Sequence, residues 1–214
     1  MPSPITLFVL AHPDDECMFF TPTVHGMRKK SELHILVLSN GGYDGLGKIR
    51  TKEMEVAAKE MGFTESTVID DPRIPDGPHP WDLTVVQELI SSHLDGMKSR
   101  GKQVGTIVTF DDYGVSGHPN HISVSQGCKK LYEKGSKHSF DLYTLESVPI
   151  YRKFIAFFDI FLSDTRQQSY SLRSPFPAMR IMACHHSQWV WFRKLFTCFT
   201  RYVYYNGLDY HPKK

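Results

Sequence analysis

The chain has 214 residues, of which 41% are hydrophobic and 22% are charged, and this balance excludes a disordered, collagen-like or low-complexity protein. The length suits a single globular domain with a core of its own. The net charge of +2 conceals an asymmetry along the chain. Residues 1–147 hold 15 Lys and Arg against 20 Asp and Glu, whereas residues 148–214 hold 10 against 3 and contain 16 of the 27 aromatic residues. A basic, aromatic back segment indicates a charged or interfacial partner.

Apolar runs alternate with stretches of helical spacing along the front of the chain. Strands are predicted at residues 5–11, 33–39, 66–70, 104–110 and 142–147. Helices are predicted at residues 17–31, 48–62, 82–100 and 119–135. Strands that alternate with helices form right-handed βαβ units, so the pattern predicts one α/β domain with a Rossmann-like, mostly parallel sheet and helices on both faces. Residues 70–80 are expected to form a long ordered loop.

The loop after the first predicted strand reads His12-Pro13-Asp14-Asp15-Glu16. In open α/β sheets, ligands bind outside the carboxyl ends of the strands. Carboxylates at this position would repel a phosphate and attract a cation, unlike the glycine-rich loop of a dinucleotide site. His12 and Asp15 are expected to face one coordination site, which leaves Asp14 free to move protons. The alternative is an acidic helix N-terminus, and we favour that interpretation for Glu16 alone.

A second polar cluster follows the fourth predicted strand, where a glycine-containing loop leads into a helix start that carries His118 and His121. Two histidines three residues apart can face one cavity. If His12 and Asp15 hold a metal, His121 is a natural third ligand, and the open position would admit water and substrate as in catalytic zinc sites. The same ligands suit Fe²⁺, so the residue types leave the metal open. A cap or surface position is the alternative for a lone histidine.

Together the two clusters resemble the LmbE-like zinc deacetylases. Within them the chain is most similar to the N-acetylglucosaminyl-phosphatidylinositol (GlcNAc-PI) de-N-acetylases of glycosylphosphatidylinositol (GPI) anchor synthesis. The motifs that carry the resemblance include Ala11-His-Pro-Asp-Asp-Glu16, Gly117-His-Pro-Asn-His121, Arg50-Thr-Lys-Glu53, Cys184-His-His-Ser-Gln188 and Trp191-Phe-Arg193. The resemblance covers nearly the whole chain.

The resemblance implies a metal-dependent hydrolase that removes acetate from the GlcNAc of GlcNAc-PI. In the family pattern His12, Asp15 and His121 bind Zn²⁺, Fe²⁺ or another divalent metal. Asp14 is then the general base that takes a proton from the attacking water, and His118 stabilises the oxyanion.

Two further roles have alternatives of similar weight. Arg50 is expected to bind the inositol phosphate of the substrate, and a surface pair with Glu53 is the competing interpretation. Either Asp111 or Asp112 is expected to orient a histidine, the alternative being a cap of the following turn.

Residues 1–147 are expected to form the deacetylase core with the metal site, and residues 148–214 are expected to belong to the same domain. Four phenylalanines of the back segment have helical spacing, namely Phe154, Phe157, Phe158 and Phe161. This spacing fits either a core helix or a helix that lies in a bilayer interface beside basic residues. The back segment is therefore a candidate membrane-facing surface.

No run of about 18 apolar residues lacks a charge, and residues 5–11 are too short for a signal peptide, so neither a spanning helix nor a leader is predicted. Relatives in the GPI branch often begin with a membrane-spanning helix, whereas this chain starts a few residues before the first motif. We expect a peripheral protein at the cytosolic face of the endoplasmic reticulum membrane. Its expected partners are the GlcNAc-PI glycolipid and a membrane surface, with no nucleic acid.

Two other functions compete with GlcNAc-PI deacetylation. One is a deacetylase of a soluble GlcNAc conjugate, against which the basic, aromatic tail argues. The other is a non-catalytic phosphosugar-binding protein of the same fold, against which the complete set of predicted catalytic and ligand residues argues.

Overall fold

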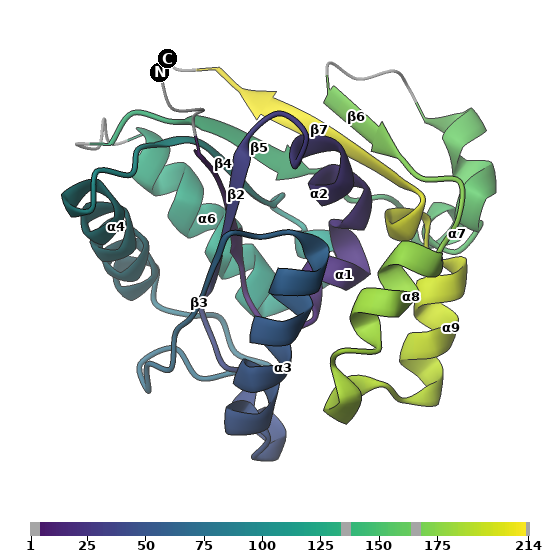
Figure 1. The fold of residues 1–214 in the computed structure, drawn as a ribbon, viewed down its shortest axis with the longest axis horizontal. Coiled ribbons are helices and arrows are strands. Elements are labelled where there is room, and N and C mark those ends of the chain that lie inside the picture. Colours follow the sequence, from purple (N-terminus) through teal and green to yellow (C-terminus); the bar gives the residue numbers. More distant parts are fainter. Residues whose placement is uncertain (1–4, 134–137, 164–167, 213–214) are drawn as a thin grey trace.

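Strand β1 (Ile5–Leu10) lies inside a mixed sheet in the computed structural model, which describes residues 5–133, 138–163 and 168–212. Within those ranges seven strands are ordered β3-β2-β1-β4-β5-β7-β6 (Figure 1). The other strands are β2 (Glu32–Val37), β3 (Glu65–Val68), β4 (Val104–Phe110), β5 (Asp141–Leu145), β6 (Gln168–Ser171) and β7 (Tyr205–His211). Strands β1 to β5 run parallel, whereas β7 is antiparallel to β5 and β6 is antiparallel to β7.

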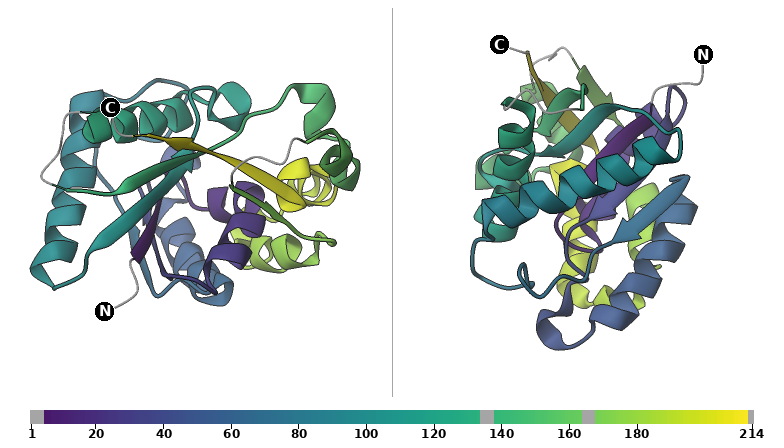
Figure 2. Two further views of the ribbon diagram at one scale, coloured as in Figure 1. Left: turned by 90° about the horizontal axis from the view of Figure 1, so that it is seen from above. Right: turned by 90° about the vertical axis from the view of Figure 1, so that its left-hand side faces the viewer.

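Helices cover both faces of the sheet (Figure 2), with α4 and α6 packed together on one face. The helices are α1 (Asp15–Phe19), α2 (Thr21–Met27), α3 (Gly47–Met61), α4 (Leu83–Ser99), α5 (Gly114–Gly117), α6 (Pro119–Glu133), α7 (Ile150–Lys153), α8 (Phe176–Met182) and α9 (Trp191–Phe199). Short 3₁₀ segments are η1 (Gly42–Asp44), η2 (Ala156–Leu162), η3 (His186–Gln188) and η4 (Arg201–Val203). In the described residues no helix is both long enough and apolar enough to span a membrane.

The predicted α/β fold with a mostly parallel sheet is confirmed, and each of the five predicted strands is present with its ends moved by at most two residues. All six residues of β1 are buried, which explains why a continuous apolar run marks this strand. Phe8 packs edge-on against Phe20 and Phe63 from the helical layer, with ring centroids 5.9 and 5.4 Å apart. Burial of this kind contributes about 25 cal/mol per Å² of apolar surface.

The predicted helix 17–31 is wrong as one element. Phe20, at φ −116° and ψ 5°, separates α1 from α2, and Pro22 near the start of α2 lacks the N–H that a continuous helix needs. The predicted helix 119–135 matches α6 as far as Glu133, and residues 134–135 lie outside the described part of the chain.

The back segment differs most from prediction. In place of one helix over 148–163 the chain forms the short α7 and the 3₁₀ segment η2. The core-helix interpretation is wrong, because the side chains of Phe158 and Phe161 are 70% and 75% exposed. Strands β6 and β7 were not predicted, yet β7 pairs with β5, so residues of the front and back segments share one sheet and one domain.

Candidate active site

The loop after β1 has a strained backbone at Asp14. Its φ of 101° lies in the left-handed region, which costs a residue other than glycine about 1–2 kcal/mol. The Asp14 N–H donates to Glu16 Oε2 at 3.0 Å, and Arg50 Nη2 donates to the Pro13 carbonyl at 2.6 Å. These contacts hold the turn in its strained shape, as is common at functional sites.

Asp15 lies between two of the predicted metal ligands. Its Oδ2 accepts hydrogen bonds from the His12 and Ala11 N–H groups at 2.8 and 3.1 Å, and its Oδ1 lies 3.2 Å from His121 Nε2. Burial alone would raise the pKa of Asp15, but His121 and His12 lower that pKa well below its usual range. Asp15 is therefore a carboxylate at neutral pH.

Neighbouring acceptors fix which ring nitrogen of each ligand histidine carries the proton. His121 Nδ1 donates to the Gly114 carbonyl at 3.0 Å, so Nε2 presents its lone pair. His12 Nε2 lies 3.0 Å from both Asp76 Oδ1 and Asn120 Oδ1, so this nitrogen donates and Nδ1 presents its lone pair.

His118 has the opposite arrangement. The backbone N–H of Asn120 donates to His118 Nδ1 at 3.2 Å, so in the neutral ring Nε2 carries the proton. Burial is the largest cause that lowers the pKa of His118, to about 4. The ring is neutral at neutral pH and offers one N–H donor.

These donor atoms suit a divalent cation. The ring nitrogens of His12, His118 and His121 lie within 4.8 Å of one another. His121 Nε2 and Asp15 Oδ1 are both acceptors by the assignment above and face each other at 3.2 Å, an arrangement that a cation shared between them would stabilise. Imidazole nitrogens with one carboxylate are ligands typical of zinc and of other first-row metals.

Two guanidinium groups flank the Asp14 carboxylate. Arg50 Nη2 lies 3.4 Å from Oδ1, and Arg193 Nη2, from α9, lies 3.2 Å from Oδ2. Burial raises the pKa of Asp14, and the charges of Arg193 and Arg50 lower it without cancelling the rise. Asp14 is thus a buried carboxylate whose affinity for a proton is above normal.

All six predicted site residues line one cavity of about 440 Å³ at the carboxyl ends of the strands. These are His12, Asp14, Asp15, Arg50, His118 and His121. The two predicted clusters, more than a hundred residues apart in the chain, therefore meet as the parallel-sheet rule requires.

Comparison with known proteins agrees with this constellation. Residues 7–132 match the family model described as PIG-L, GlcNAc-PI de-N-acetylase. The chain is 36% identical to a probable N-acetylglucosaminyl-phosphatidylinositol de-N-acetylase of Schizosaccharomyces pombe, over 94% of this chain and 85% of that protein. The chain belongs to the GlcNAc-PI de-N-acetylase family. It is also 36% identical to the N-acetylglucosaminyl-phosphatidylinositol de-N-acetylase of Bos taurus, over 96% of this chain and 83% of that protein.

A solved structure extends the comparison to the fold of the family. The N,N'-diacetylchitobiose deacetylase of Pyrococcus horikoshii superposes with a TM-score of 0.66, over 97% of this chain and 84% of that one, at 14% sequence identity. At this identity the likeness supports the fold, and the chemistry has to be argued from the residues.

In this family member Arg50 is buried and both of its terminal nitrogens donate hydrogen bonds, while its buried Nε has no hydrogen-bond partner in the described residues. Nη1 donates to the Gly41 carbonyl at 2.9 Å and Nη2 donates to the Pro13 carbonyl. The alternative surface pair of Arg50 with Glu53 is wrong, because the Glu53 carboxylate instead accepts from the N–H and Oγ of Ser187 at 2.7 and 2.6 Å. Arg50 thus ties the loop after β1, which carries Pro13, to the loop after β2, which carries Gly41.

The expectation that Asp111 or Asp112 orients a histidine is wrong. Asp111 accepts from the N–H groups of Tyr113 and Gly114 at 3.1 and 3.0 Å and from Ser147, so it caps the following turn. Asp112 pairs with Lys129 at 2.7 Å on the surface. The turn that Asp111 caps contains Gly114, whose carbonyl accepts the hydrogen bond that orients His121.

Behind the site, Glu16 and His185 form a fully buried pair. His185 Nε2 lies 2.6 Å from Glu16 Oε1, while Glu16 Oε2 accepts the Asp14 N–H. Burial alone would lower the pKa of His185, but Glu16 raises it above its usual value. Together with Cys17 these residues could also hold a cation, but each carboxylate oxygen already accepts a hydrogen bond.

Three residues of the site were missed from the sequence. Asp76 and Asn120 accept from His12, and Arg193 contacts Asp14. Asp76 comes from the long loop 70–80, which was predicted as ordered but carries no motif. Asn120 and Arg193 each stood inside a motif of the resemblance, but neither was given a role.

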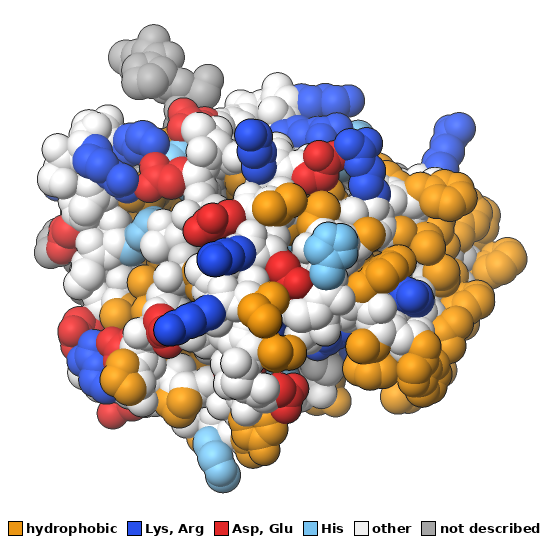
Figure 3. All heavy atoms as spheres, turned by 60° about the horizontal axis from the view of Figure 1, so that its bottom comes forward, with side chains coloured by type: hydrophobic (Ala, Val, Ile, Leu, Met, Phe, Trp, Pro, Cys, Tyr) orange, Lys and Arg blue, Asp and Glu red, His pale blue; other side chains and the backbone are white. Residues whose placement is uncertain are grey.

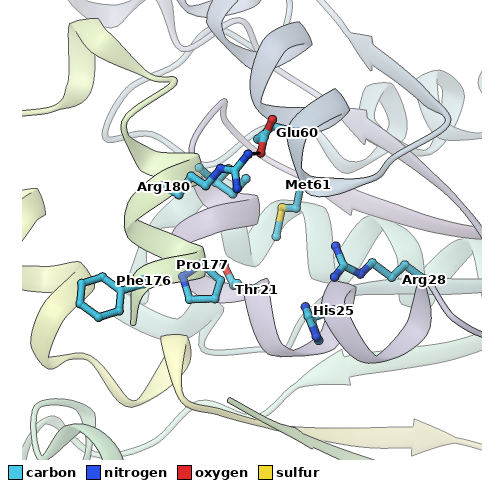
Figure 4. Close-up of a pocket in the computed structure, with 9 residues that line it drawn as sticks. Thr21, His25, Arg28, Glu60, Met61, Phe176, Pro177 and Arg180 are labelled. Carbon is cyan, nitrogen blue, oxygen red and sulfur yellow. Dashed lines mark ion pairs between the residues drawn. The ribbon is translucent and has the colours of Figure 1, made fainter. Parts of the chain in front are cut away.

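A second cavity of about 340 Å³ lies away from this site, between α2, α3 and α8 (Figure 4). Its wall carries Arg180, which pairs with Glu60, together with His25 and Arg28. This cavity is lined by none of the predicted site residues, all of which line the cavity at the ends of β1 and β4.

Proposed function

We propose that this protein hydrolyses the N-acetyl group of GlcNAc-PI to give GlcN-PI and acetate, the deacetylation step of GPI-anchor synthesis. The observation that carries this proposal is the convergence of His12, Asp14, Asp15, His118 and His121 on one cavity. The 36% identity to de-N-acetylases over nearly the whole chain supports the substrate.

We infer that His12 Nδ1, His121 Nε2 and the Asp15 carboxylate hold the metal, with Zn²⁺ favoured and Fe²⁺ or another divalent metal as alternatives. The hydrogen bonds to the far nitrogens of both rings leave these atoms as lone-pair donors. When bound, the cation supplies Lewis acidity that polarises the amide carbonyl and lowers the pKa of water.

Asp14 is the general base in this proposal. Its carboxylate lines the cavity beside the ligand cluster, and burial raises its pKa, so that it takes up a proton more readily than an exposed aspartate. It removes the proton from the attacking water and returns it to the departing amine. Carbon–oxygen bond formation and carbon–nitrogen bond cleavage thus leave acetate and a free amino sugar.

His118 serves as a hydrogen-bond donor to the oxyanion of the tetrahedral intermediate. Its Nδ1 accepts the Asn120 N–H, so Nε2–H is available. Because this nitrogen holds a proton in the neutral ring, His118 suits a donor role better than a ligand role. The loss of one such donor typically costs about 3–4 kcal/mol of transition-state stabilisation.

The sequence predicted Arg50 as the residue that binds the inositol phosphate. Its buried hydrogen bonds to Gly41 and Pro13 instead favour a role in holding the loops around the ligand. Its Nη1 lies 3.8 Å from Asp76 Oδ2, so it also supports the aspartate that contacts His12.

The back segment, residues 148–214, supplies the surface that faces the bilayer, at the cytosolic face of the endoplasmic reticulum membrane. Hydrophobic side chains gather on the side of the molecule that carries α8 and α9 (Figure 3). Phe158, Phe161, Phe176 and Trp191 are 70–75% exposed. Exposed apolar surface rimmed by polar groups is typical of interaction sites, and a membrane-held sugar lipid requires such a contact.

The central test is deacetylation of GlcNAc-PI in detergent-free vesicles, with and without a chelator, together with elemental analysis of the purified protein. We expect acetate release that the chelator abolishes and about one equivalent of zinc. Full activity after complete metal removal would contradict the metal-dependent mechanism.

His121→Ala tests the ligand set by metal content. We expect loss of the bound metal, since the variant removes one of three protein ligands. One equivalent of tightly bound metal in this variant would show that His121 is not a ligand.

A liposome flotation assay separates the lipid substrate from a soluble GlcNAc conjugate. Flotation with neutral or anionic vesicles supports the membrane-facing surface. Failure to float with either kind, combined with turnover of a water-soluble GlcNAc conjugate, would favour the soluble alternative.

A further inference from the structure

Among the described residues that line the cavity with the predicted site, two side chains, Arg50 and Arg193, carry a permanent positive charge. The two guanidinium groups differ in their exposure and in the hydrogen bonds that they already make. Arg50 is 7% exposed and donates to the carbonyls of Gly41 and Pro13. Its Nε has no hydrogen-bond partner in the described part of the chain but is buried, so a phosphate could reach this guanidinium only by moving the two loops that it holds. A phosphate-binding role therefore fits Arg50 poorly.

Arg193 is held more loosely and is more open. Its side chain is 21% exposed, and its Nη2 lies 3.2 Å from Asp14 Oδ2, an oxygen that accepts no hydrogen bond in the described residues. Nη1 donates to Gln188 Oε1, a side chain that also lines the cavity. A guanidinium with this freedom can exchange its contact with Asp14 for a bidentate contact with an anionic ligand.

The position of Arg193 on α9 decides which anion it would meet. The neighbouring side chains Trp191, Phe192 and Leu195 are 72%, 52% and 50% exposed, while Arg193 reaches into the cavity. α9 therefore lies at the rim where the cavity meets the exposed apolar surface. In a sugar–inositol lipid, the phosphodiester occupies the corresponding position, between the sugar that reacts and the acyl chains.

We propose that Arg193 recognises the phosphodiester of the lipid-linked substrate at this rim and makes the enzyme selective for phosphodiester-bearing GlcNAc compounds. The inference rests on the proposed function, because it names a specificity residue for the same cavity. A phosphodiester at the rim would also draw Arg193 away from Asp14, so ligand recognition and release of the general base from an ion pair would occur together.

The test compares two soluble substrates, so that membrane binding does not enter the measurement. One is GlcNAc-PI with acyl chains short enough to stay monomeric, and the other is GlcNAc-inositol without the phosphodiester. Arg193→Gln should lower the ratio of kcat/KM for the first substrate to kcat/KM for the second about tenfold or more, as expected for a lost hydrogen bond to a charged group. The ratio removes any effect of the lost Asp14 contact that both substrates share. Arg193→Lys, which keeps the charge, should recover part of the loss.

Lys194→Gln is the matched control. It removes the same charge from the next position of the same helix, but Lys194 lies over the Trp189 ring at 5.1 Å and is not among the residues that line the cavity. We expect this variant to keep the wild-type ratio of kcat/KM values for the two substrates. An equal change of that ratio in Lys194→Gln and Arg193→Gln would overturn the proposal, since the effect would then be one of general charge.

Equilibrium binding provides a readout that does not depend on turnover. Glycerophosphoinositol, a phosphodiester without acyl chains, should bind the wild type and Lys194→Gln alike and bind Arg193→Gln about tenfold more weakly. Equal affinity for all three proteins, or equal losses of kcat/KM on both substrates, would overturn the inference while leaving the proposed function standing. A wild-type protein that releases no acetate from GlcNAc-PI would instead contradict the proposed function, and the binding comparison would still decide the role of Arg193.

Discussion

Two regions of this protein depart from the usual pattern of burial, in which charged side chains are exposed and large apolar side chains are buried. One is the loop at residues 12–16, and the other is the aromatic surface of the back segment. In the loop three acidic side chains are buried, with Asp14, Asp15 and Glu16 only 4%, 3% and 0% exposed. On the back segment large rings face outward, with Phe158 and Trp191 70% and 72% exposed. Charged groups are normally outside and large apolar groups are normally inside.

The two reversals differ in how their cost is offset. Each buried carboxylate has its partner within the chain: arginines for Asp14, histidines for Asp15 and His185 for Glu16. Such pairing is what makes a buried charge tolerable. The exposed rings have no comparable cover from the described residues of the chain, and we propose that a bilayer covers them. The buried charges of residues 12–16 are therefore paired within the chain, whereas the proposed cover of the back surface comes from outside it.

The largest expected effect is on kcat, when a carboxylate of the loop at residues 12–16 is replaced. Asp14→Asn removes a base without removing a proposed ligand, so it should lower kcat by about 10²- to 10⁴-fold while the metal content stays at the wild-type level. Acetate release and elemental analysis measure the two quantities. Activity within a few-fold of wild type would show that another residue is the general base and that the buried Asp14 carboxylate has no catalytic role.

The next effect is on stability behind the loop. His185→Ala leaves Glu16 buried without its partner, and loss of one member of a buried pair typically costs about 3–5 kcal/mol. Chemical denaturation measures the free energy of unfolding. Arg73→Ala breaks an exposed pair with Asp71 and is the control, with a free energy expected near the wild-type value. Equal effects of the two variants would show that burial of Glu16 is not what makes the pair important.

Exposed rings should respond in the opposite way. Phe158→Ser combined with Trp191→Ser should change the free energy of unfolding by less than about 1 kcal/mol, since surface substitutions typically stay within about 0.5 kcal/mol each. The same variant should bind vesicles at least about tenfold more weakly, because a buried ring is worth about 1.5–3 kcal/mol. Unchanged vesicle binding would indicate that the surface has a different partner.

The smallest effect is the pH dependence of the buried pair. The pKa of His185 is raised in the folded protein, so its stabilising contribution is fully present below about pH 6.5, the usual histidine pKa, and is lost as the pH rises through the folded-state pKa. The difference in unfolding free energy between wild type and His185→Gln should therefore be larger near about pH 6 than near about pH 9. A difference that grows with pH would show that the ring is neutral in the folded state.

Local sequence determined the framework of this protein. Continuous apolar runs mark the central strands, such as β1 and β2, because nearly all of their residues are buried. The strand-end rule then brings His12 and Asp15 to the same edge as His118 and His121. The Arg50 and Asp111 contacts did not follow from sequence, since each depends on backbone groups that are distant in the chain or set by a turn.

Tertiary structure alone decided the rest. Strand β7 forms by pairing with β5, and the spacing of apolar residues within β7 does not predict a strand. Asp76 enters the site from a loop without a motif, and Arg193 enters it from α9, a helix with several exposed aromatic side chains. The local pattern of apolar residues determines which segments are buried. The partners of a buried charge instead depend on how segments far apart in the chain pack together. For that reason the sequence predicted the ligand cluster, and only the fold revealed the arginine at its rim.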